Sequence, residues 1–78
     1  MIAETEVASL IAAALPGAKV TVTDTTGTGD HFQATVVAEQ FKGKTLVEQH
    51  QMVYAPLREL MAKNIIHALS LKTSAPEH

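Results

Sequence analysis

The sequence predicts an α+β fold, a two-layer sandwich in which helices cover one face of a three-stranded mixed sheet. Three observations favour this class. Apolar residues recur at helical spacing in three segments and alternate with polar residues in three others. Glycine and proline separate these segments, which follow one another as helix, strand, strand, helix, helix and strand. A sheet of this size cannot bury its apolar face alone, so we expect the helices to cover it.

The first helix is expected over residues 4–15. Glu4 and Glu6 lie near its amino end, where the helix dipole favours negative charge, and Pro16-Gly17 ends it. The apolar residues at helical spacing are Val7, Leu10, Ile11, Ala14 and Leu15.

Two strands should follow as an antiparallel hairpin. In the first, which reaches about Asp24, Ala18, Val20 and Val22 alternate with polar residues, as a half-buried strand requires. The second strand shows the same alternation at Phe32, Ala34, Val36 and Ala38. We expect the Gly-rich loop at the tip of this hairpin to carry Asp30 and His31.

Two helices are expected next. Thr45 and Glu48 have the spacing of a capping box, so a helix should begin near Thr45. Pro56 suits the first turn of another helix, because proline has no amide hydrogen to leave unbonded there. The first helix has Val47, His50, Gln51 and Tyr54 on one face, and the second has Leu57, Leu60, Met61 and Asn64 at helical spacing.

The last strand is predicted from the alternation of Ile65, His67, Leu69 and Leu71 with their neighbours. This alternation places His67 at the opening of the strand, on its apolar face. Residues 1–78 should form a single domain, and residues 73–78 should be a polar, flexible tail.

Composition excludes several classes of protein. The 78 residues include no cysteine, which excludes disulfides, thiol catalysis and a self-sufficient zinc-thiolate or iron-sulfur site. Six basic residues against eight acidic ones argue against strong nonspecific binding to nucleic acid. The longest apolar run spans only residues 10–15, and the amino-terminal sequence lacks a signal pattern, so we expect a soluble cytoplasmic protein.

Histidine carries the main chemical signal, because His31, His50, His67 and His78 are the residues here best suited to borderline transition metals. We interpret His50 as a packing residue and His78 as a terminal one. The pattern at His67 fits a structural histidine, with metal ligation as the alternative, and His31 should be exposed. Two imidazoles leave a metal site half filled, so a partner would have to supply the other ligands. No catalytic arrangement can be assembled, so no enzyme is expected.

Lys42 and Lys44, with Lys63 as a further candidate, could form a modest basic corner for phosphate contacts. The two adjoining helices could be a helix-turn-helix, but their balanced charges favour packing against the sheet. The sequence contains no Gly-x-x-Gly, the backbone clamp by which KH domains hold single strands.

Four spaced motifs resemble the BolA family, and with the first helix they cover nearly the whole chain. The resemblance implies the same element order and a fold like that of a class II KH domain without the Gly-x-x-Gly loop. The motifs are Asp30-His31-Phe32, Phe41-x-Gly43, Val47-x-x-His50-x-x-Val53-Tyr54 and Ile66-His67-Ala68-Leu69-Ser70-Leu71-x-Thr73.

For function, the resemblance implies an adaptor that binds a monothiol glutaredoxin and shares a bridging [2Fe-2S] cluster with it and with glutathione. His67 matches the family's histidine ligand, and His31 is the loop imidazole available as the second ligand. No cofactor is then expected in the isolated protein, which should be a monomer or a weak homodimer. Two alternatives are a DNA-binding regulator of stress response and cell shape, using Lys42 and Lys44, and a metal-free glutaredoxin-binding module, using the surface from Val47 to Lys72.

Overall fold

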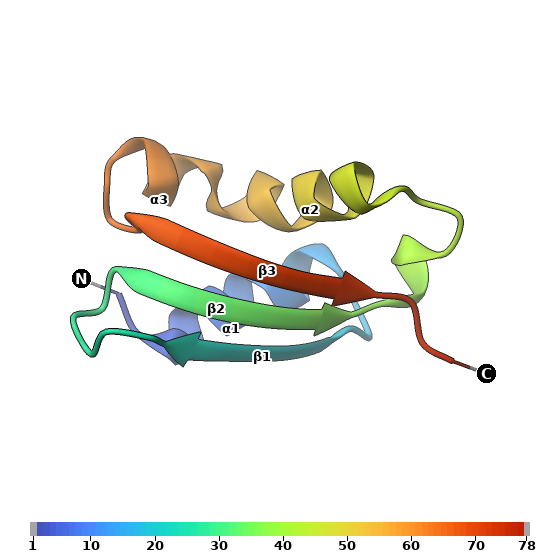
Figure 1. Cartoon of the computed structure of the whole chain (residues 1–78), viewed down its shortest axis with the longest axis horizontal. Helices are drawn as coiled ribbons and strands as arrows, with labels where there is room; N and C mark the ends of the chain where they lie inside the picture. The colour runs from blue at the N-terminus through green and yellow to red at the C-terminus, as the bar shows by residue number, and fades with distance from the viewer. Residues whose placement is uncertain (1, 78) are drawn as a thin grey trace.

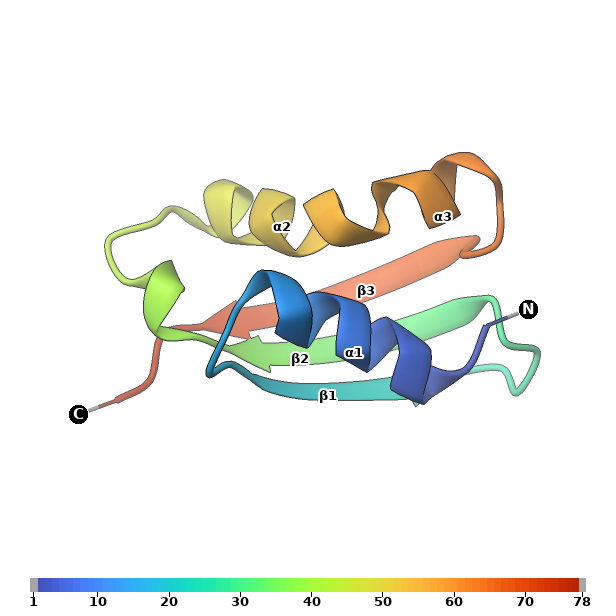
Figure 2. The same cartoon turned by 180° about the vertical axis from the view of Figure 1, so that it is seen from behind.

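The computed structural model describes residues 2–77 and confirms the predicted order of elements. Figures 1 and 2 show two layers, with the helices on one face of the sheet. The short 3-10 turns η1 (Glu39–Phe41) and η2 (Ala55–Leu57) precede α2 and α3. The elements are α1 (Glu4–Ala14), β1 (Lys19–Asp24), β2 (His31–Val37), α2 (Leu46–Tyr54), α3 (Arg58–Ala62) and β3 (Ala68–Ser74).

The sheet has the order β1-β2-β3 and is mixed, as predicted. β1 and β2 pair antiparallel, whereas β2 and β3 pair parallel. A parallel pair needs a long crossover connection, which α2, η2 and α3 supply. The parallel register places His31 opposite Ala68, so β2 and β3 begin at the same end of the molecule.

The core lies between the central strand and the helices. β2 has neighbours on both sides, so its inner residues Phe32, Ala34 and Val36 are fully buried. The edge strands β1 and β3 bury their inner residues only in part. The buried residues outside β2 are Val7, Ile11, Leu15, Ala38, Phe41, Val53, Leu57 and Ile66.

The buried faces of α1 and α2 differ from the predicted ones. In α1 the contact follows residues four apart, Val7 and Ile11, while Leu10 is 38% exposed. In α2 the buried residue is Val53, and Val47 is 67% exposed. α2 lies along the edge strand β3, so a narrow stripe is sufficient to cover that side of the sheet (Figure 1).

The carboxyl end also differs from the prediction. β3 includes Thr73 and Ser74, which the sequence pattern placed in a flexible tail. Their backbones continue the pairing with Val36 and Val37, and the Thr73 hydroxyl donates to Oε1 of Gln49 in α2 at 2.7 Å. His78 lies outside the described residues.

The start of α2 gives a first testable prediction. The Thr45 side chain accepts from the Glu48 N–H, and the Glu48 carboxylate accepts from the Thr45 N–H, so the capping box is confirmed. Thr45→Ala should therefore lower the free energy of unfolding by about 1 kcal/mol in urea denaturation at neutral pH. Ser9→Ala, at an exposed position of α1, is the control and should cause no loss.

The same variant should show a pH dependence. The hydrogen bond from the Thr45 N–H, with help from the Thr45 hydroxyl and the Lys44 charge, lowers the pKa of Glu48. The stabilisation by this carboxylate is therefore complete above its unfolded pKa of about 4.3 and is lost as the pH falls through the lower folded pKa. The difference between wild type and Thr45→Ala should narrow on acidification, and a difference that widens would contradict this assignment.

Candidate metal centre

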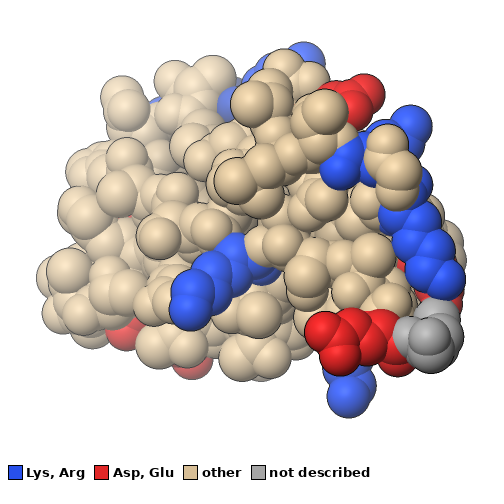
Figure 3. All heavy atoms as spheres, turned by 45° about the vertical axis from the view of Figure 1, so that its right-hand side comes forward, with Lys and Arg blue, Asp and Glu red and all other residues tan. Residues whose placement is uncertain are grey.

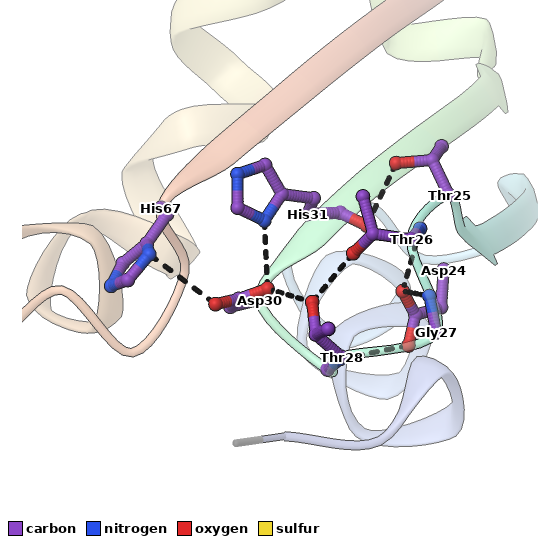
Figure 4. A network of polar contacts seen from close by, with 9 residues as sticks. Asp24, Thr25, Thr26, Gly27, Thr28, Asp30, His31 and His67 are labelled. Atoms are coloured by element: carbon purple, nitrogen blue, oxygen red, sulfur yellow. Dashed lines mark hydrogen bonds and ion pairs between the residues drawn. The ribbon is translucent and has the colours of Figure 1, made fainter.

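The loop between β1 and β2 is organised around the side chain of Asp24. One carboxylate oxygen accepts from the N–H groups of Thr26 and Gly27 at 3.2 and 2.9 Å, and the other accepts from Gly29 at 2.9 Å. Gly27 and Gly29 have φ of +75°, a conformation that glycine adopts at little cost. These bonds close the loop tightly, and the chain leaves it at Asp30 to enter β2 (Figure 4).

The backbone of Asp30 joins this loop to the start of β3. Its carbonyl accepts from the N–H groups of His67 and Ala68 at 2.7 and 3.2 Å. Just before His67, Asn64 has φ of +58°, and the amides of Ile65 and Ile66 bond to the Leu60 carbonyl. This turn directs Ile66 into the core and leaves the His67 side chain 50% exposed.

The carboxylate of Asp30 lies between two imidazoles. Its Oδ1 is 2.7 Å from Nδ1 of His31, and its Oδ2 is 3.3 Å from Nδ1 of His67. The two rings meet edge to face, with centroids 5.8 Å apart. One ligand atom from each of these three residues lies within 4.8 Å of the other two. Figure 4 shows the Asp30 carboxylate between the two rings.

The electrostatics of the cluster keep Asp30 ionised. A hydrogen bond from the Thr28 hydroxyl, followed by the bond to His31, holds the pKa of the Asp30 carboxyl below its ordinary value. Desolvation raises this pKa, but by less than either hydrogen bond lowers it, and the charges of His31 and His67 add smaller lowering effects when the rings are protonated. The carboxylate is therefore available as an acceptor or a ligand at neutral and mildly acidic pH.

The structure brings His31 and His67 together but differs from the predicted positions of both. His31 is the first residue of β2 rather than part of the hairpin loop, because its carbonyl accepts from the Thr25 N–H and its backbone pairs with β3. His67 precedes β3 and points away from the apolar face, because the turn at Asn64 places Ile66 in the core. His50 lies in α2, where its Nε2 is buried without a hydrogen-bond partner among the described residues.

Asp30 is the residue that sequence reasoning missed. In the sequence, Asp30 stands out only as a loop residue and as part of the motif Asp30-His31-Phe32. Its position directly before His31 was the available signal. Without the parallel register of β2 and β3, however, nothing in the sequence places Asp30 beside His67.

The predicted basic corner lies at the other end of the molecule, between η1 and α2 (Figure 1). Lys42 pairs with Glu39 at 3.0 Å. Lys63 does not belong to this corner, because it follows α3 at the end where β3 begins, and it pairs with Glu59 at 2.9 Å. Figure 3, which turns the end with η1 forward, shows basic side chains spread among uncharged and acidic ones. These neighbouring carboxylates reduce the positive potential that a phosphate backbone would meet.

The surface between Val47 and Lys72 contains exposed apolar residues. Leu46 and Val47 are 60% and 67% exposed at the start of α2. Leu46 also borders an open groove whose other walls include His50, Leu71 and Lys72. Across residues 2–77, no helix is both long enough and apolar enough to cross a membrane.

Comparison with known proteins gives consistent matches. The family model for BolA-like proteins matches residues 11–78. The acid stress protein IbaG of Escherichia coli is 48% identical over 50 residues, which cover 64% of this chain and 60% of the relative. This chain therefore matches less than two thirds of that protein's length.

Solved structures extend the similarity over almost the whole chain. A bolA protein homologue from Coxiella burnetii superposes with a TM-score of 0.79 at 35% identity, covering 97% of this chain and 94% of the other. BolA1 from Arabidopsis thaliana has a TM-score of 0.82 at 26% identity, covering 94% and 90%.

The contact between Thr28 and Asp30 gives a second prediction. Thr28→Ala removes the largest cause of the lowered Asp30 pKa, so this pKa should rise towards its ordinary value. Carboxyl ¹³C chemical shifts followed against pH measure it, and Thr35→Ala, on the exposed side of β2, is the control. An Asp30 pKa that does not change in Thr28→Ala would show that the hydroxyl is not responsible.

The lowered pKa of Asp30 also determines how the free energy of unfolding changes with pH. Because the folded pKa of Asp30 lies below the unfolded one, its carboxylate stabilises the fold fully above the unfolded pKa of about 3.9. This contribution is lost as the pH falls through the folded pKa. Thr28→Ala should therefore be less stable than wild type near neutral pH, with a smaller deficit in strong acid.

Proposed function

The chain belongs to the BolA-like protein family, and on that premise we propose that it is a non-enzymatic adaptor which shares a bridging [2Fe-2S] cluster with a monothiol glutaredoxin. The pair would act in the cytoplasm, in iron-sulfur cluster trafficking or in iron and redox signalling. The glutaredoxin cysteine and glutathione would supply thiolates to one iron. His67 and His31 would ligate the other.

The observation that carries this proposal is the pair of half-exposed imidazoles at one end of the sheet, with ring centroids 5.8 Å apart. Because the chain has no cysteine, the thiolates for such a cluster must come from outside it. Both rings face solvent at the point where β2 and β3 begin, so a partner can reach them without disturbing the core.

The ligand set has a chemical consequence. Two neutral imidazoles in place of two thiolates reduce the negative charge on one iron and raise the reduction potential of the cluster, as in Rieske centres. Such a cluster is more easily reduced than one held by thiolates alone. This property suits a complex that responds to the redox state or the iron supply of the cell.

The first test is anaerobic reconstitution with a monothiol glutaredoxin, glutathione, iron and sulfide, followed by visible circular dichroism and native mass spectrometry. We expect a heterodimer with one [2Fe-2S] cluster and a spectrum distinct from that of the glutaredoxin homodimer. His67→Ala should abolish this spectrum and His31→Ala should alter it. His50→Ala, on α2, is the matched control and should leave it unchanged.

Far-ultraviolet circular dichroism of each apo-variant separates loss of ligand from loss of fold. A cluster spectrum that persists in His67→Ala would contradict the ligand role. A heterodimer that forms equally well without either histidine would instead support a metal-free glutaredoxin-binding module, with Leu46 and Val47 as its exposed apolar residues.

A DNA-binding regulator of stress response and cell shape remains the second candidate, and it rests on Lys42 and Lys44. Because Lys42 already pairs with Glu39, we expect only weak, strongly salt-dependent binding to duplex DNA in fluorescence anisotropy. Tight, sequence-selective binding at physiological salt, reduced by both Lys42→Ala and Lys44→Ala, would favour the regulator over the adaptor. Lys19→Ala, on β1, serves as the charge-matched control.

A further inference from the structure

We infer that Asp30, His31 and His67 form a site for a single divalent transition-metal ion of the zinc class, which the isolated chain binds without any partner. The two histidines are those of the proposed function, so the inference deepens that site. The additional donor is the carboxylate of Asp30. The ion and the shared cluster would then be alternative occupants of the same two imidazoles.

The spacing of the donors suits such an ion. With bonds of about 2.0–2.2 Å, the donors of a tetrahedral zinc site lie about 3.3 Å apart. The Asp30 oxygens lie 2.7 and 3.3 Å from the nearer nitrogens of the two rings. The donor atoms of all three residues lie within 4.8 Å of one another, so small side-chain rotations bring them around one ion.

The backbone holds the donors in place before any ion binds. The Asp30 carbonyl accepts from both His67 and Ala68, and the parallel pairing fixes His31 opposite Ala68. The Thr28 hydroxyl donates to Oδ1 of Asp30 from outside the cluster. Hydrogen bonds of this kind to a ligating carboxylate orient it and raise metal affinity.

The mixture of ligands selects the class of ion. Imidazole nitrogens with one carboxylate suit borderline ions such as zinc, cobalt and nickel, whereas magnesium and calcium prefer oxygen donors throughout. The side chains of His31, His67 and Asp30 are 40%, 50% and 24% exposed, so an ion can enter directly from solvent. Water can fill the remaining coordination positions.

Binding also requires a change of proton position. In the ion-free cluster Nδ1 of His31 is hydrogen-bonded to the Asp30 carboxylate, and Nδ1 of His67 faces it at 3.3 Å; a ring nitrogen that binds the metal must instead present a lone pair. Each ring can stay neutral by carrying its proton on the other nitrogen. A ring already bonded to zinc cannot also bond to a cluster iron through that same nitrogen. A zinc-loaded chain should therefore be a poor cluster partner.

The test is a titration of the isolated chain with Zn²⁺ by isothermal calorimetry, in a His78→Ala background that removes the terminal imidazole. We expect one ion per chain. Asp30→Asn, which keeps the size of the side chain and removes its charge, should weaken binding by more than the roughly 10- to 100-fold that loss of an outer-shell partner costs, as should His67→Ala. Thr28→Ala should weaken binding about 10-fold, at the lower end of the range for outer-shell contacts. His50→Ala and Mg²⁺ are the controls, with unchanged zinc affinity and no binding respectively.

Imidazole ¹⁵N chemical shifts identify the bound nitrogens, and the dispersion of the backbone amide signals shows independently that the variants are folded. Zinc affinity that is unchanged in Asp30→Asn would overturn the three-donor site, as would an equal loss in His50→Ala. The titration contains no glutaredoxin and no cluster, so its failure leaves the proposed adaptor function intact. Failure of the cluster reconstitution would likewise leave the zinc site intact.

Discussion

The parallel pairing of β2 with β3 is the interaction on which the rest of the molecule depends. It joins the last strand to the central one and requires α2, η2 and α3 to cross over the sheet, where Val53 and Leu57 become buried. The same register places the Asp30 carbonyl against the amides of His67 and Ala68. A strand displaced by one residue would lose both the core packing and the juxtaposition of the two imidazoles. Fold and candidate metal centre therefore share a single structural cause.

The helices and strands could be predicted from the sequence because their signals are local. The alternation of Phe32, Ala34 and Val36 defines a strand whatever it pairs with, and Thr45 with Glu48 defines a helix start whatever follows. Exposure was predicted less well. Whether Val47 is buried depends on how α2 packs against the edge of the sheet. The spacing of apolar residues within α2 does not specify this packing.

The candidate site could be predicted only in part for the same reason. Alternation alone placed His67 on the apolar face, but the left-handed conformation of Asn64 and the bond to Asp30 turn its side chain towards solvent. Asp30 became visible as a member of the cluster only once the register of a non-local strand pair was known. The histidines could be predicted as metal ligands from their residue type alone. The position of Asp30 beside His67 could not, because it depends on the pairing of two segments that are distant in the sequence.

The loop organised by Asp24 has a consequence for how this protein can diversify. The Asp24 carboxylate accepts hydrogen bonds from the loop amides. The hydrogen bond from the Thr25 N–H to the His31 carbonyl closes the base of the loop. At the tip of this loop, residues 26–28 are exposed, so their number and identity can vary without cost to the buried core, whereas Gly29 is buried and the Asp30 carbonyl bonds to His67 and Ala68. Evolution or design can therefore exchange this segment and bring a different donor beside His67 while the scaffold stays the same. In such a protein, metal preference can change while the packing of the buried core stays the same.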